Sequence, residues 1–284
     1  MKRGLHVFLS ILVLLLIFSP AARADTGPKP SVCITFADLP DGPCYGTLLS
    51  QRNTNGPDWA YGTYGEEEPG GYRQSQPGWE TFVNYQDPDG YYYLQLSWEV
   101  HETLQLNWTY YPPDPFKILL YFPESGTFIS SDILERYAFD SYFSATVNGD
   151  TLTVRRSYNY TWELISLAAR VLLTIAIELA IALLFKYRAK RQFVFLAAVN
   201  IITQIALNVA LNIINYSAGW MAFVAFYILL ELAVFAIEAV LYSAFLPKLG
   251  RATGKGRAVA YAFAANAVSF AAGFMIAKLI PGIF

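Results

Sequence analysis

The sequence predicts an α+β membrane protein, in which an N-terminal all-β, sandwich-like ectodomain is followed by a four-helix transmembrane bundle. Hydrophobic residues make up 55% of the 284 residues and charged residues only 15%, which is more apolar than an ordinary soluble domain. After the start of the chain, residues 25–160 alternate apolar and polar side chains with the period of two that is typical of β-strands. Residues 161–284 contain four apolar runs long enough to cross a membrane as helices.

Residues 1–24 have the three parts of a secretory signal peptide. Lys2 and Arg3 supply a positive start, and the apolar core that follows has about 12 residues, which is short for a span of roughly 20. Pro20 precedes a cleavage site whose small residues are Ala22 and Ala24. We therefore expect removal after Ala24. An uncleaved anchor is the alternative, and it would add one helix without changing the topology of the rest.

Residues 25–160 form the predicted ectodomain, with about seven short strands that favour a loosely immunoglobulin-like sandwich over a barrel. Val32, Ile34 and Phe36 share one face of the first strand, and a turn at 40–42 would fold the next strand against it as a tight hairpin. Residues 51–77 are rich in Gly, Asn, Pro, Glu and Gln, which predicts a long irregular insertion.

The later ectodomain elements follow from local patterns. The predicted elements are a short helix or strand at 79–85, strands at 91–100 and 103–110, a central apolar strand at 117–122, and strands at 142–147 and 151–156 that pair across Asn148-Gly149-Asp150.

The ectodomain has two cysteines, Cys33 and Cys44, and export would permit a disulfide between them. In a tight hairpin centred on Asp41, however, five strand residues at ~3.3 Å each would separate the thiols by about 16 Å, beyond disulfide reach. We expect free thiols, because a Cys33–Cys44 disulfide requires a looser turn.

Composition and motifs exclude several function classes. The net charge of −2 provides no electrostatic surface for nucleic acid. The apolar half has neither His nor Cys, which excludes an intramembrane zinc site of the His/Cys kind and an H-E-x-x-H protease. No nucleophile elbow or phosphate-binding glycine loop is present, so the sequence predicts no cofactor and favours a protein that is not an enzyme.

Two groups of ectodomain residues invite functional interpretations. Asp87 and Asp89 are potential calcium ligands, but two acids in this turn do not complete a twelve-residue calcium loop. The many Tyr and Trp side chains would suit a stacking surface for a sugar, a peptide or peptidoglycan. We favour a packing role for them, because the period-two spacing of pairs such as Tyr91 and Tyr93 already explains them.

The four predicted spans cover residues 162–185, 193–214, 220–246 and 258–280. Lysine and arginine gather in the first and third connecting loops, and the middle loop at 215–219 has none. By the positive-inside rule both basic loops are cytoplasmic, which places the N-terminal domain and the C-terminus outside. We therefore expect a multi-pass plasma-membrane protein whose first partner is the lipid bilayer.

Nine polar residues inside these runs form the candidate site. An ionisable group in lipid is costly and must face protein or a water-filled cavity, so it marks a functional site by default. With a rise of ~1.5 Å per residue, the three acids lie between the bilayer centre and about 8–10 Å to its cytoplasmic side. The nine residues are Glu178, Asn200, Thr203, Gln204, Asn208, Glu231, Glu238, Asn266 and Ser269.

Two interpretations of this set remain open. Amides and hydroxyls hydrogen-bond across membrane helices at ~0.6 kcal/mol each, with no role beyond assembly. The three glutamates have no matching lysine or arginine at their depth. They must be protonated, hydrogen-bonded to the amides, or neutralised by a cation, and pH or an ion could switch any of these states.

Several segments carry a resemblance to known sequences over nearly the full chain. In the ectodomain they are residues 27–31 (GPKPS), 111–113 (YPP), 116–124 (FKILLYFPE) and 135–143 (ERYAFDSYF). In the membrane half they are Glu178, Asn200-x-x-Thr203-Gln204, Glu231, Glu238 and Asn266-x-x-Ser269. These segments resemble a group of uncharacterised membrane proteins from gut Firmicutes. The resemblance implies a bacterial plasma-membrane location and implies no activity.

Two functional hypotheses follow. The first is a cell-surface binding or sensing protein, whose ectodomain takes an extracellular or envelope ligand and whose bundle anchors it or relays the signal. The second is a cation- or proton-coupled transport component that uses Glu178, Glu231 and Glu238, and since four helices are few for a transporter, it requires a homo-oligomer or a membrane partner. A third, an intramembrane hydrolase with a glutamate-held cation, has no supporting nucleophile or motif.

Overall fold

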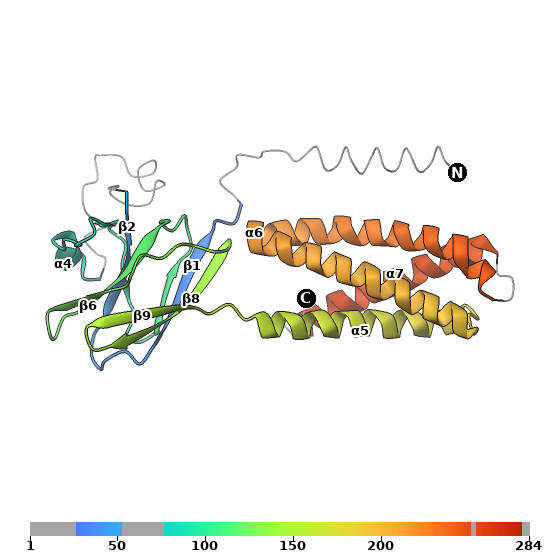
Figure 1. Ribbon diagram of the computed structural model, residues 1–284, viewed down its shortest axis with the longest axis horizontal. Helices are drawn as coiled ribbons and strands as arrows, with labels where there is room; N and C mark the ends of the chain where they lie inside the picture. The colour runs from blue at the N-terminus through green and yellow to red at the C-terminus, as the bar shows by residue number, and fades with distance from the viewer. Residues whose placement is uncertain (1–26, 53–76, 251–253, 280–284) are drawn as a thin grey trace.

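The computed structural model describes residues 27–52, 77–250 and 254–279. A β-rich N-terminal domain, for which we keep the name of the predicted ectodomain, lies at one end of the molecule, and the helices extend from it side by side (Figure 1). The predicted signal peptide and nearly all of the predicted insertion lie outside the described residues.

The ectodomain contains two sheets. The first has the strand order β5-β1-β8-β9, with β1 parallel to β8 and the other pairs antiparallel. The second has the order β3-β2-β6-β7, with β4 also paired to β2. The strands are β1 (Ser31–Ala37), β2 (Tyr45–Ser50), β3 (Tyr92–Tyr93), β4 (Trp98–Glu99), β5 (Gln105–Trp108), β6 (Phe116–Phe122), β7 (Thr127–Ser130), β8 (Asp140–Asn148) and β9 (Thr151–Arg156).

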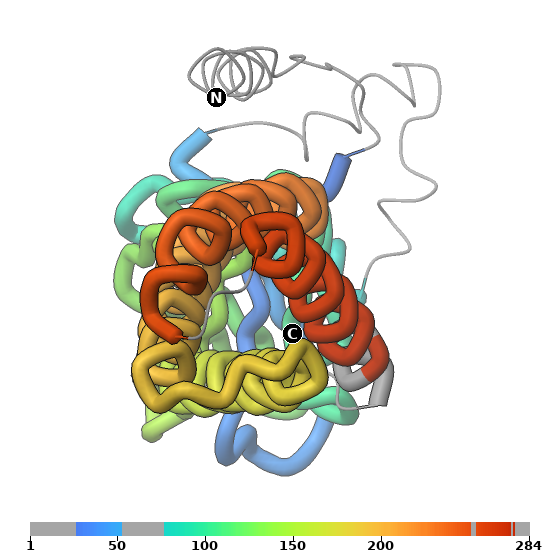
Figure 2. Tube along the Cα trace, turned by 90° about the vertical axis from the view of Figure 1, so that its right-hand side faces the viewer, coloured from blue at the N-terminus to red at the C-terminus, as the bar shows by residue number. Residues whose placement is uncertain are grey.

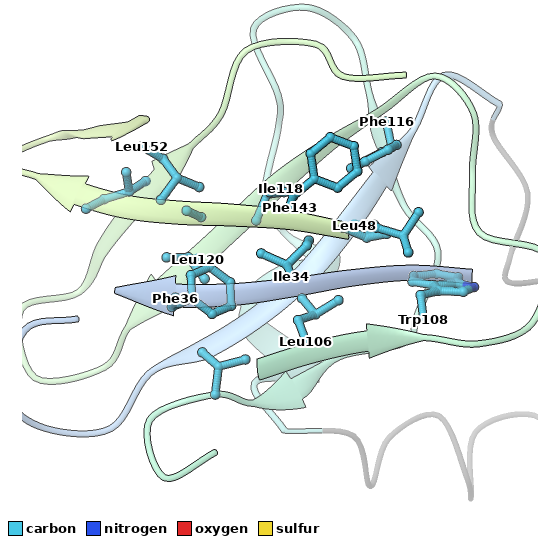
Figure 3. Packing of buried hydrophobic residues seen from close by; sticks show 14 of the residues in the cluster. Ile34, Phe36, Leu48, Leu106, Trp108, Phe116, Ile118, Leu120, Phe143 and Leu152 are labelled. Carbon is cyan, nitrogen blue, oxygen red and sulfur yellow. The ribbon is translucent and has the colours of Figure 1, made fainter. Parts of the chain in front are cut away.

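The main hydrophobic core of the ectodomain lies between these sheets. Ile34 and Leu106 from the first sheet pack with Leu48, Ile118 and Leu120 from the second, and all five are fully buried (Figure 3). Alternation along β1 directs one face into this core, as the sequence predicts. Burial of such apolar surface is the main favourable contribution to folding.

Two local predictions for the ectodomain are confirmed. The strand β6 is central in its sheet, between β2 and β7. The strands β8 and β9 form a hairpin in which Asn148 pairs with Thr151 and the turn falls at Gly149 and Asp150. The predicted element at 79–85 contains the short helix α4 (Trp79–Val83), and the predicted strand at 91–100 is instead the two short strands β3 and β4.

The predicted hairpin of the first two strands is wrong. Strand β1 pairs with β5 and β8, whereas β2 belongs to the other sheet, so the turn at 40–42 carries the chain across the core from one sheet to the other. The reason is that Val32, Ile34 and Phe36 of β1 and Leu48 of β2 are buried in the same core, so the two strands face each other from opposite sheets. Cys33 and Cys44 are both free thiols.

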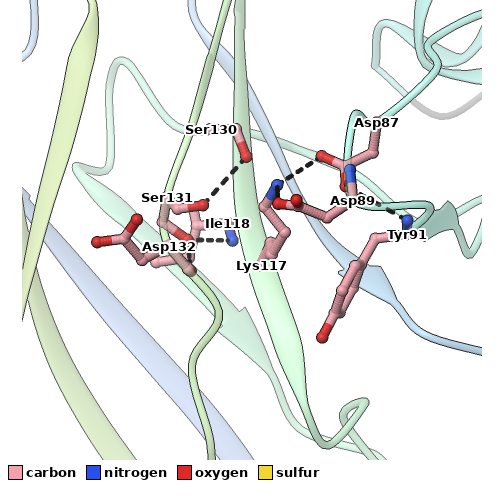
Figure 4. A network of polar contacts seen from close by, with 8 residues as sticks. All are labelled: Asp87, Asp89, Tyr91, Lys117, Ile118, Ser130, Ser131 and Asp132. Atoms are coloured by element: carbon pink, nitrogen blue, oxygen red, sulfur yellow. Dashed lines mark hydrogen bonds and ion pairs between the residues drawn. The ribbon is translucent and has the colours of Figure 1, made fainter.

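Lys117 is a buried lysine in the strand predicted to be wholly apolar. Its Nζ lies 2.7 Å from Asp87 Oδ1 and 2.9 Å from Asp89 Oδ2 (Figure 4). Burial opposes the charged form, but the hydrogen bonds and charges of the two aspartates outweigh it and raise the pKa of Lys117. The two acids of the turn therefore neutralise a lysine.

The helical region consists of α5 (Tyr160–Leu184), α6 (Lys190–Phe245), a 3₁₀ turn (Leu246–Lys248) and α7 (Lys255–Leu279). Gly219 interrupts α6 with φ 78° and ψ −179°, and there the chain reverses (Figure 1). We call residues 190–218 the first arm and 220–245 the second arm. The predicted loop at 215–219 is therefore helical up to Gly219, where the break needs a single residue because glycine alone tolerates this conformation.

Two described helices are long and apolar enough to cross a membrane. They are Tyr160–Leu184 and Lys190–Lys248, and the second includes both arms of α6. Viewed along their length, α5, the two arms and α7 surround a common centre (Figure 2).

Candidate functional site

The polar residues of the helical region meet at the centre of the helices. Glu178 on α5, Asn200 on the first arm, Glu238 on the second arm and Asn266 on α7 are all at most 5% exposed. Each helix or arm thus contributes a buried Glu or Asn. We call these four residues, with Thr203 and Tyr242, the central cluster.

Glu178 pairs with Asn200. The amide nitrogen Nδ2 of Asn200 donates to Glu178 Oε2 at 2.7 Å, and it also lies 3.1 Å from the carbonyl oxygen of Leu196 and 3.0 Å from the hydroxyl of Tyr242. A carbonyl oxygen can only accept, so the contact with Leu196 fixes which end of the amide is nitrogen.

Glu238 has a polar neighbour at each carboxylate oxygen. The Nδ2 of Asn266 donates to Oε2 at 2.7 Å, and the hydroxyl of Thr203 lies 2.7 Å from Oε1 and also 3.0 Å from the backbone oxygen of Val199. Asn266 Nδ2 also donates to the carbonyl oxygen of Ala262 at 3.0 Å, which fixes its orientation in the same way. The hydroxyl of Tyr242 is a further hydrogen-bond partner of Glu238.

Glu178 differs from Glu238 in the hydrogen-bond partners of its carboxylate oxygens. Within the described part of the chain, Glu178 Oε1 and Asn200 Oδ1 are buried atoms without a hydrogen-bond partner. Buried polar atoms are nearly always paired, so each exception calls for an explanation. Both atoms are acceptors when Glu178 is ionised, and they belong to two groups that are already joined by one hydrogen bond.

Tyrosines enclose the cluster on the side away from the ectodomain. Tyr261 on α7 donates its hydroxyl to the backbone oxygen of Glu178 at 3.2 Å, and its ring packs against Tyr187 and Tyr242. Tyr242 and Tyr261 are not among the site residues predicted from the sequence. The available signal was a hydroxyl-bearing ring within an apolar run, because such a ring needs a partner when buried.

The remaining predicted residues lie outside this cluster. Glu231 lines an open pocket of about 250 Å³ together with Phe235, Asn266 and Phe270, and its partner is Tyr227 on the same arm. Asn208 donates to the backbone oxygen of Gln204 at 2.8 Å, a bond within the first arm. Ser269 donates to the backbone oxygen of Asn266 at 3.1 Å.

A second set of contacts joins the ectodomain to the break in α6. The backbone N–H of Phe139, just before β8, donates to the backbone oxygen of Tyr216 at 2.8 Å. A Cβ at Gly219 would lie 2.5 Å from two atoms of the Phe139 ring, so the ring lies directly on the glycine. Tyr137 and Tyr158 pack their rings against Tyr216, with centroids 6.3 and 5.9 Å away. We call these five residues the junction.

Tyr158 also ties the junction to the start of α5. Its hydroxyl donates to the carboxylate of Glu163, in the first turn of that helix. Burial and this carboxylate raise the pKa of Tyr158, so its hydroxyl stays protonated at neutral pH. The ectodomain is thereby held against both α5 and α6.

Comparison of this chain with protein families, with curated proteins and with solved structures finds no match.

Proposed function

We propose that this chain is a multi-pass plasma-membrane protein that binds or senses an extracellular or envelope ligand and relays the binding event to a four-helix transmembrane bundle. The junction is the observation that supports it best. A module that was only tethered would need no more than the chain link into α5. Here a backbone hydrogen bond and a ring–glycine contact also join the ectodomain to the turn of α6.

The surface of the helices supports the membrane location. Only 22% of the most apolar window of α5 and 11% of that of the second spanning helix are buried within the chain, which differs from the core helix of a soluble protein. Apolar side chains such as Leu172 and Ile202, each 68% exposed, therefore face outward. In water this surface would be strongly unfavourable, whereas a bilayer accommodates it.

Charge at the end of the helices away from the ectodomain agrees with the predicted orientation, in which the basic loops are cytoplasmic. The start of the first arm has an apolar pocket of about 470 Å³ bordered by Lys190 and Arg191. Basic side chains above apolar walls suit the cytoplasmic headgroup region of a bilayer. The ectodomain, at the opposite end of the helices, would then be outside.

In this proposal, the break at Gly219 relays movement of the ectodomain to the two arms of α6. The junction holds the break, the first arm carries Asn200 and Thr203, and the second arm carries Glu238. A ligand that moved the ectodomain would change the angle between the arms, and with it the bond from Thr203 to Glu238. Such coupling requires the ligand to favour one arrangement of the arms over the other.

A gene-replacement experiment tests this function. The native gene is replaced by wild type, by an ectodomain deletion that keeps all helices, by Phe139→Ala, or by a Phe128→Ala control within the ectodomain, and growth under cell-wall stress is compared. We expect the deletion and Phe139→Ala to lose the wild-type response and Phe128→Ala to keep it. A wild-type response in the deletion strain would contradict a sensing role.

The second candidate is a cation- or proton-coupled transport component that uses Glu178, Glu231 and Glu238. The partnerless Glu178 Oε1 and the open pocket beside Glu231 favour it. Proton or sodium flux into proteoliposomes that disappears in the Glu231→Gln, Glu238→Gln double variant would support it over the first. This function would require a homo-oligomer or a membrane partner.

A further inference from the structure

The helical region contains one sequence pattern twice. Ala176-Ile177-Glu178, with Phe185 seven residues after the glutamate, recurs as Ala236-Ile237-Glu238 with Phe245. Ala198-x-Asn200-x-x-Thr203 then recurs as Ala264-x-Asn266-x-x-Ser269. The Glu and the Asn are 22 residues apart in the first copy and 28 in the second, and the basic loop that lies between them in each copy accommodates the difference.

The two copies also correspond in space. The first is the hairpin of α5 and the first arm, and the second is the hairpin of the second arm and α7. Both α5 and the second arm start at the ectodomain and run away from it, so the hairpins point the same way (Figure 1). Parallel repeats of this kind place a shared site at the interface between them.

Equivalent residues make equivalent hydrogen bonds. In each copy the asparagine donates Nδ2 to the glutamate of its own hairpin at 2.7 Å, and to the backbone oxygen four residues earlier. The contact between hairpins differs. Thr203 and its equivalent Ser269 both contact the backbone oxygen three residues earlier, but Thr203 also approaches Glu238 of the other copy at 2.7 Å. Glu178 Oε1 is the atom that lacks the equivalent donor.

We propose that Glu178 and Glu238 form one paired-acid site between two repeated hairpins, and that the site holds a single proton on Oε1 of Glu178. A carboxylic acid and a primary amide form two complementary hydrogen bonds. Asn200 Nδ2 already donates to Oε2, and a proton on Oε1 would be donated to Asn200 Oδ1, which pairs both remaining atoms. Glu238 is the ionised member in this arrangement, in which Asn266 donates to Oε2 and Thr203 gives its single hydroxyl hydrogen to Oε1 at 2.7 Å instead of to the Val199 oxygen at 3.0 Å.

The neighbouring groups agree with one proton for two acids. Among the described residues, the titratable side chains around Glu178 are Glu238 and Tyr242 on the second arm, Tyr261 on α7, Tyr187 in the basic loop and, further away, Glu231. None of them is a cation. Two nearby buried carboxyl groups cannot both ionise without a counter-charge, so a shared proton is the arrangement with the lowest charge. The proposal rests on the membrane location proposed above, but it requires no ectodomain ligand.

Infrared spectroscopy of the full chain in lipid nanodiscs at neutral pH tests the proposal. Wild type should show the C=O stretching band of a protonated carboxyl group, Glu178→Gln should lose it, and Glu238→Gln should keep it. Absence of the band in wild type, or its loss in Glu238→Gln alone, would overturn the assignment of the proton to Glu178.

Thermal unfolding separates this result from a failure to fold. Glutamine at 178 can accept from Asn200 and donate back to it, so Glu178→Gln should unfold at the wild-type temperature or above. Glu238→Gln places an N–H₂ donor against the donors that already face this side chain, so it should unfold at a lower temperature than wild type. Adding Asn266→Asp to Glu238→Gln replaces one of those donors by an acceptor, and it should restore part of the loss. Stabilisation of wild type, but not of Glu178→Gln, by sodium, potassium or calcium would overturn the proton in favour of a cation. Failure of every variant to insert would instead count against the membrane location.

Discussion

The backbone N–H of Phe139 donates to the backbone oxygen of Tyr216, and the ring of Phe139 lies on Gly219 three residues further along α6. This relationship joins the residue before β8, an interior strand of its sheet, to the one interruption in a long helix. In the proposed relay, these two contacts make the geometry of the two arms depend on the position of the ectodomain.

Gly219→Ala should destabilise the protein in two separable ways. The φ of 78° with ψ near 180° costs a non-glycine residue about 1–3 kcal/mol, and the new methyl group would overlap the Phe139 ring. Phe139→Ala removes only the overlap. A double-mutant cycle of thermal unfolding in detergent should therefore show a Gly219→Ala penalty that is smaller in the Phe139→Ala background. Equal penalties in both backgrounds would mean that the ring does not press on the break.

Asn266→Leu should destabilise the helical region by about 1–3 kcal/mol, because it leaves Glu238 Oε2 without its donor. Asn208→Leu is the matched control, since Asn208 is similarly buried and its Nδ2 donates to a carbonyl of its own helix, and it should cost no more than ~0.6 kcal/mol. Chemical unfolding in mixed micelles measures both changes. Similar losses for the two variants would indicate that the bond to Glu238 has no special weight.

Lys117→Met should be far more damaging than Asp89→Ala, although both break the same ion pair. The lysine substitution leaves the fully buried side chain of Asp87 without its counter-ion, at a cost of about 3–5 kcal/mol. Asp89 is 58% exposed, and its loss should cost at most ~1 kcal/mol. Chemical unfolding of the two purified variants, followed by tryptophan fluorescence, would compare their free energies of unfolding. Equal losses would refute the buried pairing.

The same lysine predicts an alkaline limit of stability. Its pKa in the folded protein is raised above the ordinary value of 10.5, so its contribution is fully present below that value. The contribution is lost as the pH rises through the higher folded pKa. Melting temperatures of wild type should fall in this alkaline range, and those of Lys117→Met should fall less. Parallel curves would show that another group causes the loss.

Labelling can test the sidedness of the membrane insertion. Cys44 is fully buried, and burial raises its pKa to about 12, so it should not react with a maleimide in the folded protein. In a Cys33→Ser background, a membrane-impermeant maleimide should label Thr151→Cys on the exposed ectodomain hairpin in intact cells. It should label Arg188→Cys in the basic loop only after the cells are opened. The reverse pattern would invert the topology.

Local signals carried most of what the sequence predicts correctly. The β8–β9 hairpin follows from Asn148-Gly149-Asp150, and the central position of β6 from its apolar run, because both depend on neighbouring residues. The partners of β1 were not predictable in this way. Its parallel neighbour β8 lies more than a hundred residues further along the chain, and periodicity contains no information about such distant pairing.

The site was predicted in part for a similar reason. Buried polar groups in apolar helices need partners, so a meeting of Glu178, Glu238, Asn200 and Asn266 follows from physical chemistry alone. Glu231 does not join them. It shares a helix face with Glu238, but seven residues separate the two by about 10.5 Å along the arm, so its carboxyl group lies at another height. The duplication of the Glu and Asn pattern was visible in the sequence and identifies the two central pairs without Glu231.

The most direct measurement is the infrared carboxyl band of Glu178 in Phe139→Ala, with Phe128→Ala as the control. If the junction sets the angle between the arms, loosening it should shift or broaden the band, while the control should leave the wild-type band unchanged. An identical band in wild type and Phe139→Ala, with both proteins inserted and folded, would contradict coupling between the ectodomain and the buried acids.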